Sequence, residues 1–213
     1  MDYTRLPESD AAVETAARHV QAGGLLVHPT TGVYGIGGRR DPAVETAVAR
    51  LKERAAGAVL IYLVDGEAGA RRAFPDLGWE PPARLLAERF WPGPLTLVLA
   101  DGSESGRAIR SEGHPFTAAL VRAAGRAVSS TSMNRSGEPP ARSPAEVARV
   151  LDGVPTCELP VLWIDAGELP GPPPSTLVRL RDGRIEVLRE GAVPRSAIDA
   201  AIEAAATRPE AGA

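Results

Sequence analysis

Short apolar runs alternate with helical segments along this chain, and the alternation limits the folds that it can adopt. The clearest run, Ala58–Val64, contains no charged residue and is predicted to be a strand buried on both faces. A helix is predicted to begin at Asp41-Pro42, because aspartate caps a helix and proline fits its first turn, and to continue to Leu51. Alternating helices and strands are typical of an α/β domain.

The other elements are predicted from the same patterns. Asp182-Gly183, between two alternating segments, predicts a two-residue hairpin turn. Further helices are expected at Ser9–Gln21, Glu67–Ala73, Ala83–Phe90, His114–Ala124, Ser143–Leu151 and Pro194–Ala205. Further strands are expected at Leu25–His28, Leu95–Leu99, Arg107–Arg110, Ala127–Ser130, Val161–Asp165, Thr176–Leu180 and Arg184–Arg189. We therefore predict one α/β domain with a mixed sheet over residues 1–205 and a frayed tail over residues 206–213.

The overall charge gives no sign of a nucleic-acid or membrane partner. The chain has 24 basic and 27 acidic residues, a formal net charge of −3. No apolar run is long enough to span a bilayer, and the N-terminus lacks a basic start followed by an apolar core. The single cysteine, Cys157, excludes an intramolecular disulfide and lies in a proline-bounded connection, where we expect no catalytic role. These features favour a cytoplasmic protein.

Lysine and asparagine each occur only once, and both fall in polar segments. The 24 basic residues are 23 arginines and one lysine, Lys52, and the only asparagine is Asn134. Arginine keeps the charge of lysine but not its compact ammonium group. A chain that uses arginine almost everywhere and keeps one lysine therefore points to a specific requirement at position 52.

Three polar segments are candidates for a phosphate site. The glycine-rich loop Pro29–Arg40 would let backbone amides approach an anion, although an ordinary turn explains it as well. Lys52 and Arg54 lie at a helix end, where they can converge on a polyanion or offset the helix dipole. The segment Ser130–Gly137 brings hydroxyls and the single carboxamide to a strand end, where a capped turn is the alternative.

Taken in order, these segments resemble the threonylcarbamoyl-AMP synthases, the family with a YrdC-like domain. The resemblance extends from about Gly23 to about Ile198. It rests on the order Pro-Thr-x-x-Val-Tyr-Gly-x-Gly, Lys-x-Arg, Trp-Pro-Gly-Pro-Leu-Thr, an Arg before His-Pro, Ser-x-Asn-x-Ser-Gly, Pro-Ser-Thr and Leu-Arg-x-Gly. It implies a twisted open mixed sheet flanked by helices, with a concave basic cleft.

The resemblance also implies an activity. Such a nucleotidyltransferase forms threonylcarbamoyl-AMP and pyrophosphate from L-threonine, bicarbonate and ATP, for threonylcarbamoylation of a tRNA adenosine. The implied partners are ATP with Mg²⁺, bicarbonate, L-threonine or a related amine, and tRNA, double-stranded RNA or tRNA-modifying proteins. No protein side chain is expected to hold a metal, since His28 and His114 lack ligand spacing.

The family motifs imply roles for particular residues of this chain. Lys52 and Arg54 would be catalytic and would stabilise the triphosphate as pyrophosphate leaves. The implied ATP-binding residues are Lys52, Arg54, Ser132, Asn134 and Arg189. The implied threonine- and carbamate-binding residues are Thr30, Arg110, Ser130 and Ser175. His114 and Trp91, by contrast, are expected to serve the structure, as a helix start and a packing corner.

Several positions depart from the family pattern, and they gather on the amino-acid side. Thr31 and Gly32 replace an acid and a second threonine of the first motif. Ala55, Val59-Leu60 and Leu63 replace a proline, a Pro-Leu pair and a histidine. Two alternatives therefore stand beside the synthase: a paralogue that handles a carbamoyl-adenylate for another acceptor, and an RNA-binding module without turnover.

Overall fold

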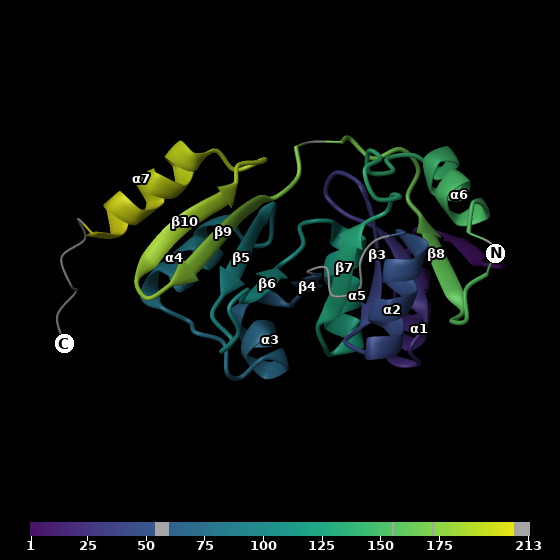
Figure 1. Ribbon diagram of the computed structural model, residues 1–213, viewed down its shortest axis with the longest axis horizontal. Helices are drawn as coiled ribbons and strands as arrows, with labels where there is room; N and C mark the ends of the chain where they lie inside the picture. Colours follow the sequence, from purple (N-terminus) through teal and green to yellow (C-terminus); the bar gives the residue numbers. More distant parts are fainter. Residues whose placement is uncertain (54–59, 155, 172, 207–213) are drawn as a thin grey trace.

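The computed structural model describes residues 1–53, 60–154, 156–171 and 173–206 (Figure 1). Within these residues, the strands form one sheet in the order β1-β8-β2-β3-β7-β4-β6-β5-β9-β10. The pairs β1–β8, β2–β8, β4–β6 and β5–β9 are parallel and the others antiparallel, so the predicted mixed sheet is confirmed. The strands are β1 Thr4–Pro7, β2 Leu25–Pro29, β3 Tyr34–Arg39, β4 Ile61–Leu63, β5 Leu95–Leu99, β6 Arg107–Arg110, β7 Val128–Ser132, β8 Val161–Asp165, β9 Thr176–Arg181 and β10 Arg184–Arg189.

Helices cover both faces of the half that contains β2 and β8. Leu25 packs in a core with α2 and α6, whereas its neighbour Leu26 packs in a second core with α1 and α5. Successive side chains of a strand point to opposite faces, so the sheet lies between the two helix pairs. The helices are α1 Asp10–Gln21, α2 Pro42–Leu51, α3 Gly66–Ala73, α4 Pro81–Phe90, α5 Pro115–Ala124, α6 Pro144–Asp152 and α7 Arg195–Ala206.

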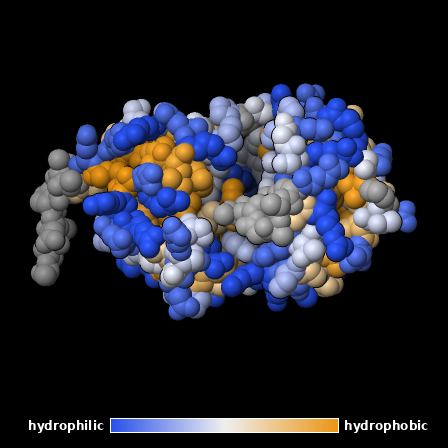
Figure 2. All heavy atoms as spheres, viewed as in Figure 1, coloured by the Kyte–Doolittle hydropathy of each residue, from blue (hydrophilic) through white to orange (hydrophobic). Residues whose placement is uncertain are grey.

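A third core holds the other half together. It joins α3, α4 and α7 to β5 and β9 through residues such as Leu86, Leu97, Leu180 and Ile198. Figure 1 shows this half separated from α2 and α6 by the short central strands β4 and β6. The space-filling view is hollowed between the two halves (Figure 2). None of the described helices is long and apolar enough to cross a membrane.

The capping signals in the sequence are confirmed. Ser143 and Glu146 form a reciprocal capping box at the start of α6, and Asp41 accepts from Ala43 N at the start of α2. Asp182 and Gly183 both have positive φ, 53° and 71°, as the two central residues of a type I′ hairpin require.

Two strands were not predicted. β1 is a largely exposed edge strand with one charged residue, Arg5, and its partner β8 lies far along the chain. β3 was assigned to the glycine-rich loop, because glycine is rare in strands. Here glycine serves close packing: a Cβ on Gly37 would lie 1.8 Å from the main-chain oxygen of Ser129 on β7.

The ends of two predicted segments lie outside the described residues. Only Ile61–Leu63 of the apolar run is described as a strand, and residues 58 and 59 are not described. The last helix extends to Ala206, and residues 207–213 are not described. The division into a domain and a tail therefore stays a prediction.

Candidate active site

Lys52 follows the last residue of α2, and its side chain is buried beneath the end of β7. The residue is 5% exposed. Its Nζ donates to the main-chain oxygen of Ser132, to the main-chain oxygen of Asn134 at 3.0 Å and to Asn134 Oδ1 at 2.5 Å. A buried ammonium needs such acceptors, and three is the number of N–H groups that it carries.

The single asparagine is fixed from both ends of its carboxamide. Asn134 Oδ1 accepts from Lys52 and from Ser132 Oγ at 2.6 Å. Asn134 Nδ2 donates to the main-chain oxygens of Arg135 at 2.9 Å and Glu138 at 2.7 Å. Aspartate could not donate and lysine could not accept, which explains why the carboxamide is kept here. The lone lysine and the lone asparagine are thus in direct contact.

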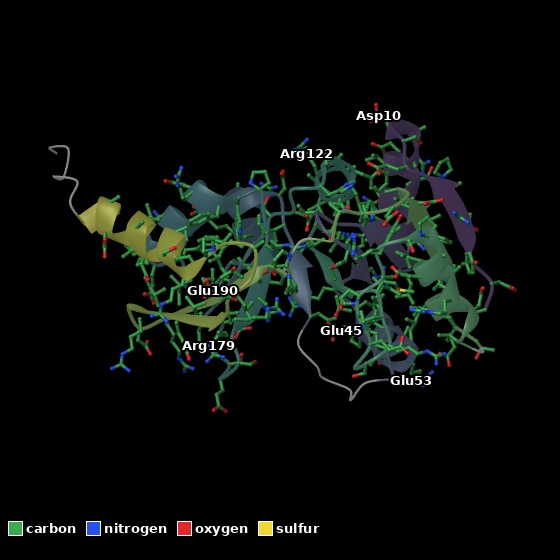
Figure 3. The ribbon with its side chains drawn as sticks, turned by 90° about the horizontal axis from the view of Figure 1, so that it is seen from above. Asp10, Glu45, Glu53, Arg122, Arg179 and Glu190 are labelled. Carbon is green, nitrogen blue, oxygen red and sulfur yellow. The ribbon has the colours of Figure 1, made fainter. Side chains whose placement is uncertain are left out.

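Arg54, the other predicted catalytic residue, lies outside the described residues. Its neighbour Glu53 follows the end of α2, and Figure 3 shows it in the opposite half of the molecule from Glu190, which follows Arg189. Lys52 also accepts at its main-chain oxygen from Ser136 N at 2.9 Å, which ties the end of α2 to the loop after β7.

Ser130 lies two residues before Ser132 and faces the same side of β7. Its Oγ is 3.1 Å from Nε2 of His28, and His28 Nδ1 is 3.2 Å from the main-chain oxygen of Pro29. Since a carbonyl oxygen only accepts, Nδ1 carries the proton and Ser130 donates to Nε2. Burial lowers the pKa of His28 to about 4, so the ring is neutral at physiological pH.

Gly35 makes room for this serine–histidine contact. A Cβ at position 35 would lie 2.8 Å from Ser130 Oγ and 2.9 Å from the His28 ring. Thr117 completes the arrangement by donating to the Pro29 oxygen at 2.5 Å. Pro29 leads into Thr30, whose hydroxyl donates to the oxygen of Val33 at 2.6 Å and closes the turn between β2 and β3.

Glu112 is a buried carboxylate that the sequence analysis did not single out. Its Oε1 accepts from the main-chain N of Thr31 and Gly113, both at 3.0 Å, from His114 N at 3.2 Å and from the Thr31 hydroxyl. Its Oε2 accepts from Arg110 Nη2 in an ion pair. Burial alone would raise the pKa of Glu112, but the Arg110 charge and these hydrogen bonds hold the pKa below its usual value.

Arg110 and Arg189 bring two guanidinium groups to the same region. Burial and then the charge of Arg110 lower the pKa of Arg189. Arg189 Nη2 donates to the main-chain oxygen of Ser175 at 2.9 Å, and Ser175 Oγ is 2.9 Å from Thr96 Oγ1. Two cations near one carboxylate leave an excess of positive charge, which suits an anionic ligand.

These contacts gather the predicted site residues into two neighbouring groups. Lys52, Ser132 and Asn134 form the first group. The second runs from Ser130 through the Pro29–Thr31 turn and Glu112 to Arg110, Arg189 and Ser175. Ser130 and Ser132 join the groups, because both stand on one face of β7.

The residues expected to be structural have packing contacts. Trp91 Nε1 donates to the oxygen of Leu95 at 2.7 Å, and its ring meets Trp79 edge to face at 6.1 Å. Cys157 packs beside the core of α2 and α6. His114 donates its main-chain N–H to Glu112 and places its ring Nε2 3.9 Å from Glu8.

Residues 18–191 match the model of the Sua5/YciO/YrdC family, whose description is telomere recombination. The chain therefore belongs to the Sua5/YciO/YrdC family, as the motifs indicated. A threonylcarbamoyl-AMP synthase of Alkalilimnicola ehrlichii is 38% identical over 171 residues, which cover 75% of this chain and 84% of the relative. Another of Xanthomonas campestris pv. campestris is 40% identical over 168 residues, which cover 70% of this chain and 84% of the relative.

Solved structures give the same fold. P. abyssi Sua5 complexed with L-threonine aligns with a TM-score of 0.75 and 30% identity over 94% of this chain. This chain spans 60% of that Sua5 chain and 63% of a P. abyssi Sua5 variant that aligns over 93% of this chain with a TM-score of 0.79 and 28% identity. E. coli YciO, at 21% identity, shares the fold with a TM-score of 0.69 and coverage of 89% of this chain and 94% of YciO.

Proposed function

We propose that this chain forms threonylcarbamoyl-AMP and pyrophosphate from L-threonine, bicarbonate and ATP. Relatives named threonylcarbamoyl-AMP synthase and a threonine-bound Sua5 support this activity. The observation that carries it is the contact of Lys52 and Asn134 with Ser132, which stands on the same face of β7 as Ser130. We assign the first group to the nucleotide and the second group to the amino acid.

The proposed reaction has two steps. The threonine amine attacks bicarbonate to give a carbamate and water, and a carbamate oxygen then attacks the α-phosphorus of ATP and displaces pyrophosphate. Positive charge and hydrogen-bond donors stabilise the leaving pyrophosphate, so positioning and electrostatics suffice without a covalent intermediate. Mg²⁺ enters with ATP as part of the substrate complex.

Each group of residues binds one of the reactants, the first group the nucleotide and the second the amino acid and its carbamate. Lys52 holds the loop that carries the Ser132 and Asn134 groups toward the nucleotide, while Arg54 and Arg189 contact its phosphates. Thr30, Arg110, Ser130 and Ser175 bind threonine and carbamate. Ser130 donates to His28 and keeps its oxygen lone pairs as acceptors for the substrate amine.

The setting follows from the activity. We propose that residues 1–205 form one domain followed by a short tail, and that this cytoplasmic enzyme supplies its adenylate to the proteins that modify tRNA. A second candidate is an enzyme for another amine, and it is favoured by Glu112, which pairs with Arg110 at the amino-acid end. An RNA-binding module without turnover would instead use the arginines of the concave face.

The test is product formation by the purified chain. ATP, Mg²⁺ and bicarbonate are incubated with L-threonine, with other amino acids or with no amine, and pyrophosphate and the adenylate are measured by mass spectrometry. We expect both products with L-threonine and little without it. Pyrophosphate release that ignores threonine would reject the proposed substrate, and strong release with another amine would identify the second candidate.

A further inference from the structure

The Glu112 carboxylate is buried between the turn after β2 and the end of β6, and it is not among the residues proposed to bind ATP, threonine or carbamate. Its side chain is 0% exposed, and that of Arg110 is 12% exposed. A charge removed from water in this way is costly unless it is paired and hydrogen-bonded. The cost of burying Glu112 beside a substrate site indicates that its carboxylate has a role in fixing the neighbouring groups.

We propose that Glu112 is a positioning residue that fixes the Thr30-Thr31 turn and the Arg110 guanidinium at the amino-acid end of the site. The carboxylate does so in place of the acid that the family pattern has at position 31. This inference rests on the proposed function, because it assigns Arg110 to the amino-acid substrate.

The burial of Glu112 argues against direct binding of the substrate amine, because the side chain is 0% exposed and most of its lone-pair positions are used. A carboxylate has about four lone-pair positions in all. Oε1 already accepts from Thr31 twice, from Gly113 and from His114, and Oε2 accepts from Arg110. Glu112 therefore acts on the substrate through the groups that it holds.

The charge of Glu112 also explains how Arg110 and Arg189 can stand close together. Two guanidinium groups repel each other, and burial followed by this repulsion lowers the pKa of Arg189. The carboxylate neutralises Arg110 and fixes the direction of its guanidinium. Arg189, which has no carboxylate partner among the described residues, keeps its charge for an anion.

Position 31 can supply the same charge. Both the main-chain N and the hydroxyl of Thr31 reach Glu112 Oε1, so a longer acidic side chain at 31 would enter the space beside Arg110. Thr31 is exposed, which leaves room for the longer chain. Two carboxylates there at once would repel, which predicts that an acid at 31 is harmful with Glu112 and helpful without it.

The experiment is a double-mutant cycle with Glu112→Gln, Thr31→Glu and the double variant. Glutamine at position 112 keeps an oxygen that accepts from Thr31, but its uncharged NH2 group faces Arg110 and cannot accept from the guanidinium. We expect Glu112→Gln to raise KM for L-threonine about tenfold, as for loss of one charged hydrogen bond, with KM for ATP changed less than about twofold. Thr31→Glu alone should also raise KM for L-threonine, and the double variant should recover to within about threefold of wild type.

Asp101→Asn is the matched control. It removes a carboxylate from Arg107, at the other end of the same strand, where the ion pair is 2.8 Å long. KM for L-threonine should be unchanged. An unchanged KM in Glu112→Gln, or a double variant no better than the two single effects combined, would overturn the proposal.

The same four proteins also separate this inference from the proposed function. If wild type does not use L-threonine, the proposed function fails, and the cycle is read in Tm instead. A Tm coupling that restores the double variant supports the exchange of the carboxylate between positions 112 and 31. Additive Tm losses would refute it.

Discussion

At the scale of single residues, the site depends on buried polar groups that are held by hydrogen bonds within the protein. Lys52 has three acceptors around Nζ, and a guanidinium could not occupy the same position without displacing Asn134. We expect Lys52→Ala and Lys52→Arg each to lower kcat/KM by about 10²-fold or more. Arg50→Ala, on the exposed side of α2, is the control, and equal losses in control and test variants would contradict the assignment.

His28 predicts a pH dependence of stability. Its pKa falls from 6.5 to about 4 on folding, so the unfolded chain binds the additional proton between these values. The stability that comes from a neutral His28 is fully present above pH 6.5 and is lost as the pH falls toward 4. From pH 7.5 to pH 5 we expect a loss of about 2 kcal/mol in the free energy of unfolding.

Urea unfolding at the two pH values checks this expectation. His28→Asn has no group that titrates here, so the part of the pH dependence due to His28 should disappear in that variant. An identical pH dependence in wild type and variant would mean that His28 is protonated in the folded state or that another group carries the effect.

The sequence predicted most of the candidate site residues but not the hydrogen bonds and ion pairs that fix their side chains. Lys52 and Asn134 stood out because each is the only one of its type, and the motifs indicated Ser130 and Arg110. Glu112 was missed because a glutamate beside glycine and serine is typical of a solvated loop. The one available signal was its place two residues after Arg110. The His28–Ser130 contact joins residues 102 positions apart, which spacing along a chain cannot reveal.

At the scale of elements, β3 is built for close approach to its neighbours. Gly35 and Gly37 face different groups of β7, and a methyl group at each meets a different obstacle. At Gly37 the obstacle is the main chain of Ser129, which cannot move without breaking the sheet. At Gly35 it is the Ser130 and His28 side chains.

Alanine at position 37 and alanine at position 35 should therefore differ in their effects on stability and on activity. Gly37→Ala should destabilise the fold by about 3 kcal/mol or more, and Gly35→Ala by about 1–3 kcal/mol with a disproportionate loss of threonine-dependent activity. Gly78→Ala is the control, because its Cβ would meet only ordinary contacts at 3.5 Å. Urea unfolding and product formation are measured on all three, and equal effects at 35 and 37 would contradict the distinction.

At the scale of the whole molecule, the two groups of site residues come from different parts of the chain. Lys52 follows α2, whereas Ser175 immediately precedes β9 and Arg189 ends β10. The sequence predicted an α/β domain with a mixed sheet but not this strand order, because pairing between distant strands leaves no local pattern.

A ligand that contacts both groups should stabilise the whole molecule. With ATP and L-threonine each at about 100 times its Kd, we expect Tm to rise by roughly 10 to 20 °C in a thermal shift measurement. D-Threonine with ATP should give a smaller shift, and Lys52→Ala should lose the ATP contribution. A shift that does not distinguish the threonine enantiomers would speak against a specific amino-acid pocket.

The order of the strands also dictates when this protein can mature on the ribosome. Thr4 pairs with Leu162, and β8 inserts between β1 and β2, which are adjacent in sequence but not in space. β1 must wait until β8 has been translated before it acquires its neighbour in the sheet. Closure of this edge of the sheet therefore follows the synthesis of β8, and contacts so distant along the chain make it slow.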